Sequence, residues 1–237
     1  MNDPESPRPH SDPLHGSLQT GRPVMDLVPV GLRVTGKSVL IVGAGRVAAR
    51  KARTYAAHGA RLTVVAPQHG PEMDALDVEV RRHRRFAPVD LDDKWLVVTA
   101  TGDPEVDGSV HREAEARRIW CNAADDPEHC SVVLPATVQR GDVTVAISTG
   151  GRSPAAASWL RRRISAMLDD ATLDVVDIAS GVRDRMRASG QPTEVAGWAE
   201  VLDDNALELA LAGEHIELDA RLGAAVGAMP GSGEAQP

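Results

Sequence analysis

A short glycine-containing stretch is the first part of this sequence that could do chemistry. In LIVGAGRVAARKA, Gly43 and Gly45 follow an apolar run, and Ala48 completes a Gly-x-Gly-x-x-Ala spacing. The first glycine would permit a tight turn, the second a close approach to a pyrophosphate, and Ala48 close helix–strand packing. The following helix start would offer free N–H groups to the anion. The alternative is a strand–helix turn that binds no ligand.

The ribose-binding part of such a site is less well marked. The usual pattern places an acidic residue about 20 positions further on, where it holds the ribose hydroxyls of NAD. Here the next apolar strand ends in Ala66, Pro67 and Gln68, and no acid occurs until Glu72. No arginine directly follows that strand to favour a 2′-phosphate. Backbone groups near 66–68 or the Gln68 side chain could hold the ribose, so the residues leave NAD and NADP open.

Two carboxylates lie in CNAADDPEHCSVVLPA, just past another predicted strand. In a doubly wound sheet, ligands bind outside the carboxyl ends of the strands, where Asp125 and Asp126 would lie. A carboxylate there could accept a proton while a hydride leaves to nicotinamide. The alternative is a solvated loop aspartate that caps the next turn.

A second glycine loop, ISTGGRSP, could bind an anionic substrate. Successive N–H groups in such a loop form an anion-binding nest. Three arginines at 161–163 follow on the predicted helix, where at least one is expected to be simply solvated. The candidate substrate-binding residues are Ser148, Thr149, Gly150, Gly151 and Arg152.

Other reactive residues predict less. His129 and Cys130 are too few for a transition-metal site, so we expect a plain surface loop and no metal centre. Cys121 is expected to be a buried strand residue. The run RRHRRF at 81–86 is interpreted as a solvated strand face, with docking of an acidic ligand as the alternative.

The elements that must position these residues fall into two regions. Apolar strands are predicted at 38–42, 61–66, 78–81, 95–100 and 119–122, with helices at 46–58 and from 103 to about 118. This alternation predicts a Rossmann-like parallel sheet covered on both faces, hence an α/β fold. Strands at 131–138 and 143–148 then predict a hairpin with a turn at 139–142. Helices are predicted at 154–168, 172–188, 193–202 and 204–222.

We therefore expect five segments along the chain. They are a disordered tail at 1–24, an NAD-binding Rossmann-like domain at 25–125, a hairpin and dimerisation segment at 126–152, a helical domain at 153–222, and a disordered tail at 223–237.

Bulk composition limits the partners. The formal net charge of −8 argues against nucleic acid, because phosphate binding requires a basic surface. Two cysteines build no disulfide framework and fit a reducing compartment. No apolar run reaches membrane-spanning length, and no signal sequence opens the chain. We expect a cytoplasmic protein that binds neither membrane nor nucleic acid.

Taken together, four segments resemble one enzyme family. VLIVGAGRVAARKA, RLTVVAP, CNAADDPEHCSVVLPA and VTVAISTGGRSPAAASWLRRRI look like the siroheme synthase dehydrogenase/ferrochelatase family over about 25–170. The Cys-Asn-x-x-Asp segment followed by Ser/Thr-Gly-Gly-x-Ser-Pro is the specific part of this resemblance. The helices predicted after about residue 170 share only their general helical character with the family, not a motif.

The resemblance implies an NAD-dependent oxidation of precorrin-2 to sirohydrochlorin, with Fe²⁺ or Co²⁺ insertion as a possible second step. It places the functional aspartate on Asp125, and it implies a homodimer joined through the hairpin and helical region. The alternatives are a dehydrogenase that works with a separate chelatase, and a non-catalytic dinucleotide-sensing module. The 237 residues leave no room for the methyltransferase domain of some relatives, so precorrin-2 is expected from another protein. The implied dinucleotide contacts are Gly43, Gly45, Arg46, Val47, Pro67 and Gln68.

Overall fold

The computed structural model describes residues 27–124, 126–194 and 197–227. A five-stranded parallel sheet has the order β3-β2-β1-β4-β5. Its strands are β1 (Ser38–Val42), β2 (Arg61–Val65), β3 (Val80–Arg82), β4 (Leu96–Thr99) and β5 (Trp120–Ala123). The predicted Rossmann-like sheet is therefore confirmed. The order reverses direction at β1, which makes the carboxyl ends of β1 and β4 the expected ligand crevice.

Alternation along β1 explains why the sheet has helices on both faces. Val39 and Ile41 enter one aliphatic core with α1 (Arg46–Ala57) and α2 (Pro71–Asp74), whereas Leu40 and Val42 enter the other. That second core contains residues of α3 (Pro104–Ala116) and of the 3₁₀ helix η1 (Pro88–Leu91). The side chains of the last four β1 residues, 39–42, are all buried, so this strand lies at the centre of the domain.

The antiparallel hairpin is shifted relative to its prediction. It pairs β6 (Ala136–Arg140) with β7 (Val143–Ile147) around Gly141, and a 3₁₀ helix η2 (Pro127–His129) precedes it. The strand predicted at 131–138 was wrong over its first half. Residues Val132 and Leu134 instead pack against the first core of the sheet domain, so this apolar run bridges two units rather than extending the hairpin.

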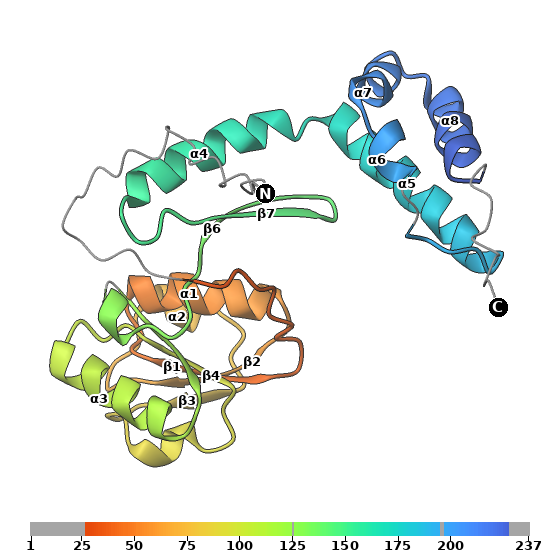
Figure 1. Ribbon diagram of the computed structural model, residues 1–237. Coiled ribbons are helices and arrows are strands. Elements are labelled where there is room, and N and C mark those ends of the chain that lie inside the picture. The colour runs from red at the N-terminus through yellow and green to blue at the C-terminus, as the bar shows by residue number, and fades with distance from the viewer. Residues whose placement is uncertain (1–26, 125, 195–196, 228–237) are drawn as a thin grey trace, which may run out of the picture.

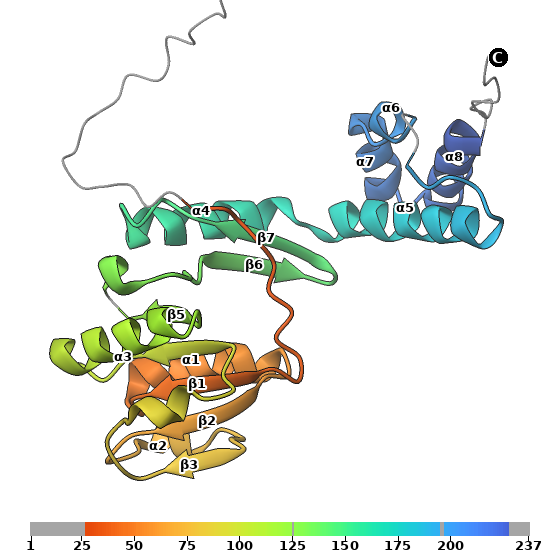
Figure 2. The same ribbon diagram turned by 60° about the horizontal axis from the view of Figure 1, so that its bottom comes forward.

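The helical region begins with α4 (Pro154–Met167) and continues with α5 (Asp170–Ala188). None of the residues of α4 is buried. It then forms α6 (Trp198–Val201), α7 (Asp204–Leu211) and α8 (His215–Gly227). Helices α5 to α8 share their own core and lie apart from the sheet in both views, joined to it by α4 and the hairpin (Figures 1 and 2).

Three boundaries in this region differ from the predictions. The single helix predicted at 204–222 is two helices, because the chain turns at Gly213, whose φ is +75°. Helix α8 continues to Gly227, so the predicted start of the C-terminal tail at residue 223 was too early. The helix predicted at 193–202 covers only Trp198–Val201 among the residues placed there. The tail predicted at 1–24 lies outside the described residues.

Candidate active site

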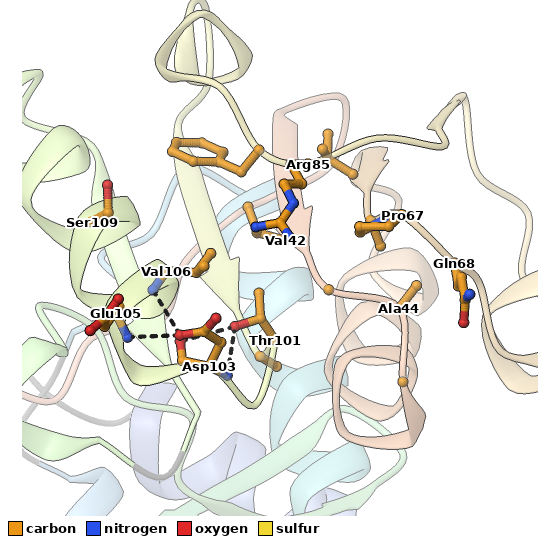
Figure 3. A pocket seen from close by; sticks show the side chains of 16 residues that line it. Val42, Ala44, Pro67, Gln68, Arg85, Thr101, Asp103, Glu105, Val106 and Ser109 are labelled. Carbon is orange, nitrogen blue, oxygen red and sulfur yellow. Dashed lines mark hydrogen bonds between the residues drawn. The ribbon is translucent and has the colours of Figure 1, made fainter.

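A cavity of about 660 Å³ lies over the carboxyl ends of β1, β2 and β4, at the point where the strand order reverses. Ligands of doubly wound sheets bind at this place. Its lining includes four of the six predicted dinucleotide contacts (Figure 3). These four are Gly43, Gly45, Pro67 and Gln68. Arg46 and Val47 form the first turn of α1 directly behind this lining.

The two glycines of the loop meet different requirements. Gly43 has a φ of +101°, and a Cβ there would lie 2.4 Å from the backbone oxygen of Ala100. Gly45 is the N-cap of α1, and a Cβ there would meet nothing within 4 Å. The helix start carries no side-chain cap and no acid in its first turn. Its N–H groups therefore stay open to an anion, and the loop fits a dinucleotide pyrophosphate.

The loop after β2 closes one side of the cavity. Gly70 donates its N–H to the carbonyl of Ala44 at 3.0 Å, which ties this loop to the glycine turn. Pro67 and Gln68 lie between these anchors and line the cavity. No acidic side chain from this loop is among the lining residues, so a ribose 2′-phosphate would meet no carboxylate here.

The opposite wall is built by the loop between β4 and α3. Buried Asp107 accepts hydrogen bonds from the hydroxyls of Thr99 and Thr101. Asp103 caps α3 by accepting from the N–H groups of its first turn (Figure 3). The wall is therefore held rigidly by its own polar contacts, because each of these carboxylates is engaged in fixing the backbone.

The loop after β5 is tied back onto its strand. The Cys121 N–H donates to Ser131 Oγ at 2.8 Å, and the Asn122 amide donates to the Val132 carbonyl at 2.8 Å. Ala124 donates its N–H to Thr99 O at 2.8 Å, beside the cavity. The predicted catalytic residue that follows, Asp125, lies outside the described residues.

Asn122 also links this loop to α1, because its side-chain oxygen accepts from Lys51 Nζ at 2.7 Å. Cys121 is fully buried, as predicted, and burial raises the pKa of its thiol to about 12. A thiol with that pKa stays protonated and unreactive near neutral pH. The Cys-Asn pair thus builds the loop rather than reacting.

The segment predicted as a plain surface loop has internal partners. His129 Nδ1 lies 2.5 Å from Asp126 Oδ2, and this hydrogen bond lowers the pKa of the Asp126 carboxyl. The His129 ring lies 5.0 Å from that of His111 on α3, and Cys130 Sγ donates to the Ala123 carbonyl. Within the described ranges, no group of three or more His, Cys, Asp or Glu side chains could hold a metal ion.

The predicted substrate loop connects β7 to α4 and contains two glycines of positive φ, Gly150 at +60° and Gly151 at +76°. Thr149 fixes its shape, because its hydroxyl accepts from Ser153 N at 3.3 Å and Ser153 in turn caps α4. The N–H groups of Gly150 and Arg152 donate within the loop, to Ser148 Oγ and to the Thr149 carbonyl, so an open anion-binding nest at residues 148–152 stays a prediction. Within one chain, however, none of these five residues lines the dinucleotide cavity.

The cavity also contains residues that the sequence reasoning did not assign. They come from the loops after β3 and β4 and from the start of α3, which reach the same edge as the glycine loop because all strands are parallel. The expected strand ends were a usable signal, since each places its following loop at this edge. The unassigned lining residues include Arg85, Phe86, Thr101, Glu105, Val106 and Ser109.

Two family models match consecutive parts of the chain. Residues 30–136 match a model described as NAD(P)-binding, and residues 140–167 match one described as sirohaem biosynthesis protein central. The boundary between them falls inside the hairpin, so the first covers the sheet domain and the second covers β7 and α4.

Curated relatives are siroheme synthases. One from Aeromonas hydrophila is 41% identical over 69% of this chain and 36% of its own length. One from Aeromonas salmonicida is 38% identical over 79% of this chain and 41% of its own length. One from Pseudomonas entomophila is 34% identical over 87% of this chain and 46% of its own length. The chain thus spans between about a third and a half of the length of these relatives.

A solved structure titled SirC, precorrin-2 dehydrogenase, has the same fold. It superposes with a TM-score of 0.65 at 23% identity, covering 83% of this chain and 98% of that one. Over residues 30–167, which hold the NAD(P)-binding and central segments in order, the chain belongs to the siroheme synthase family.

Proposed function

We propose that this protein is an NAD-dependent precorrin-2 dehydrogenase that forms sirohydrochlorin in siroheme or cobalamin biosynthesis. The observation that carries the proposal is the glycine-lined cavity at the switch point of the sheet, in a chain that also contains the sirohaem-specific central segment. A dinucleotide module without the second segment would support binding alone.

The chain's own residues would hold the cofactor in a defined way. Gly43 and Gly45 let the backbone approach the pyrophosphate, and the first turn of α1 at Arg46 and Val47 presents N–H groups to it. Pro67 and Gln68 hold the adenosine side. When bound, NAD⁺ supplies the hydride acceptor for the oxidation.

Asp125 is proposed as the base that removes the proton accompanying hydride loss. Its neighbour Ala124 is bonded to Thr99 at the end of β4, and Thr101, two residues further along, lines the cavity. The ties of Cys121 and Asn122 to the returning chain fix both ends of this loop. These contacts hold Ala124 at the carboxyl end of β4, beside the cavity.

The loop of residues 148–152 is proposed to bind the tetrapyrrole. Precorrin-2 is rich in carboxylates, which suit the cationic Arg152 and the close backbone approach that Gly150 and Gly151 permit. Since this loop does not line the cavity of its own chain, the substrate would have to span from one to the other or bridge two chains.

A homodimer would resolve this separation. The structure leaves α4 without a buried residue, and its Trp159 and Met167 are half to mostly exposed. An amphipathic helix and a two-stranded hairpin that cover no core of their own are suited to pairing with a second copy. We place the dimer contact there, and the enzyme in the cytoplasm; no helix among the placed residues could cross a membrane.

Ferrochelation is the proposed second activity. Insertion of Fe²⁺ or Co²⁺ as a substrate requires removal of two pyrrole protons, and the Asp125 carboxylate could accept them in the same site. This step needs no resident metal cage.

One spectroscopic series tests the proposal. Purified protein is given precorrin-2 and NAD⁺, and the formation of sirohydrochlorin and NADH is followed; Fe²⁺ or Co²⁺ is then added to the product. Dehydrogenation with metal insertion indicates the bifunctional enzyme, and dehydrogenation alone indicates a separate chelatase. NAD⁺ binding without turnover would identify a sensing module and reject the enzymatic proposal. In Asp125→Ala, turnover should be lost while NAD⁺ still binds.

A further inference from the structure

The arginine-rich run at 81–86 is mostly committed to holding the protein together. Arg81 donates to three backbone carbonyls in and after α2. Arg82 and Arg84 both reach the fully buried Asp90 carboxylate, with closest N–O distances of 2.6 Å. The contacts of these three arginines contradict the interpretation of the run as a merely solvated strand face. Only Arg85 remains to be explained.

The backbone at Arg85 is anchored from both sides. The Arg84 guanidinium, held by Asp90, also donates to the Arg85 carbonyl at 2.8 Å. Phe86 packs against the second core, and the Ala87 N–H donates to Asp90 at 2.9 Å. This bracing directs the Arg85 side chain toward the cavity, where its guanidinium lies beside Val42 at the end of β1 (Figure 3).

The charge of Arg85 is not neutralised by the protein. Throughout the described ranges, its guanidinium has no hydrogen-bond or ion-pair partner, although it lines the same cavity as Gly43 and Gly45. A guanidinium presents a planar fork of donors that matches a phosphate group. The lining carboxylate of Asp103 is used as a helix cap on the other wall.

We propose that Arg85 binds a phosphate group of the dinucleotide and is a determinant of cofactor affinity. The inference rests on the proposed dinucleotide-dependent function and adds a cationic contact from the loop after β3. The phosphate belongs either to the pyrophosphate, close to Gly45, or to a 2′-phosphate on the ribose near Gln68. No acid from the loop after β2 opposes a 2′-phosphate, and the lining carboxylates Asp103 and Glu105 belong to the wall at the start of α3.

Calorimetric titration of NAD⁺ and NADP⁺ into Arg85→Gln tests the assignment. A charge-assisted contact on an exposed side chain predicts an increase in Kd of about 5- to 50-fold. Equal losses for the two cofactors place the guanidinium on the pyrophosphate, and a loss confined to NADP⁺ places it on the 2′-phosphate. Arg85→Lys should recover part of the affinity, since it restores the charge without the fork.

The matched control is Arg33→Gln, which removes the same charge from an exposed position before β1, at the opposite end of the strand. It should leave both Kd values unchanged, and both variants should unfold at the wild-type temperature. Wild-type Kd values for both cofactors in a folded Arg85→Gln protein would overturn the inference while the proposed function stands. A wild-type protein that binds neither cofactor would reject the proposed function itself.

Discussion

At the scale of single residues, the cavity depends on two glycines that are required for different reasons. Gly43 has a positive φ and no room for a Cβ against Ala100, so a glycine is required there for folding. Gly45 has ordinary backbone angles and open space where a side chain would point, so its smallness serves a ligand. This contrast allows one position to be changed without disturbing the other.

Gly45→Asp should therefore fold normally and lose dinucleotide affinity. The new carboxylate would project into the space at the start of α1 and repel the pyrophosphate that the N–H groups attract. We expect NAD⁺ affinity to fall at least about tenfold, equivalent to roughly 1.4 kcal/mol, in a calorimetric titration. Gly31→Asp is the control, because a Cβ at that exposed position also meets nothing within 4 Å. Unchanged NAD⁺ affinity in Gly45→Asp would remove the loop from the cofactor site.

At the scale of elements, the loop between β3 and η1 is organised by one buried carboxylate. Asp90 accepts from Arg82, Arg84 and the N–H of Ala87, and thereby holds the segment that carries Arg85. Burial opposes the charged form of Asp90, but the hydrogen bonds from Arg84 and Ala87 outweigh it and lower its pKa below the ordinary value. A single anion thus sets the course of an otherwise irregular loop.

Asp90→Asn should destabilise the protein by roughly 2–3 kcal/mol at neutral pH, because the charged hydrogen bonds are lost with the carboxylate. The pKa of Asp90 is lowered in the folded state. The extra stability of the wild type is therefore fully present above the unfolded-state pKa of about 3.9, and it is lost as the pH falls through the lower folded-state pKa.

Urea denaturation of wild type and variant at pH 7 and at successively lower pH values measures this difference. The two free energies of unfolding should converge only below about pH 4. A difference that vanished at higher pH, or none at pH 7, would contradict the assigned role of Asp90. The variant should also bind NAD⁺ less tightly, since the loop bearing Arg85 loosens.

At the scale of the whole molecule, the chain is two packed units joined by a connector that packs little on either. The sheet domain and the α5–α8 bundle each have an aliphatic core, while α4 and the hairpin lie between them (Figures 1 and 2). Trp159 is 50% exposed and Met167 is 71% exposed on α4. Such exposed apolar side chains on a helix without a buried face favour a contact between copies.

Trp159→Glu combined with Met167→Glu should convert the proposed homodimer to a monomer. Placing two charges on the contact face leaves them unpaired and desolvated in the dimer, while neither core of the single chain is touched. Light scattering coupled to size-exclusion chromatography measures the halved mass, and circular dichroism checks the retained helicity. Wild-type protein of single-chain mass, or a variant that remains dimeric, would contradict an interface on α4.

Much of the sheet domain followed from the sequence because its determinants are local. Near-continuous apolar runs such as 38–42 that alternate with helical stretches are typical of a parallel sheet covered on both faces, and the following Gly43 and Gly45 mark the turn into α1. The start of α3 was equally local, since Asp103 caps the helix before Pro104. The dinucleotide loop could therefore be placed on its correct strand end.

What the sequence could not decide were pairings between distant residues. The apolar residues Val132 and Leu134 have strand-like character but are buried against the sheet domain, and a local pattern does not contain that choice. The break at Gly213 depends on tertiary packing. Residues of α7 and α8 share a core with α5, and the chain needs a turn between the two helices for both to pack there.

The same reason separates the arginines at 81–86. In the sequence they are equivalent neighbours in a polar run. Arg82 and Arg84 form ion pairs within the protein because the fold places Asp90 beside them. Arg85 is left facing the cavity because β3 lies beside β2, so that its following loop ends next to Gln68 and the glycines. The sequence by itself determined the elements and the glycine loop; the packing of parallel strand ends determined which side chains share the site with it.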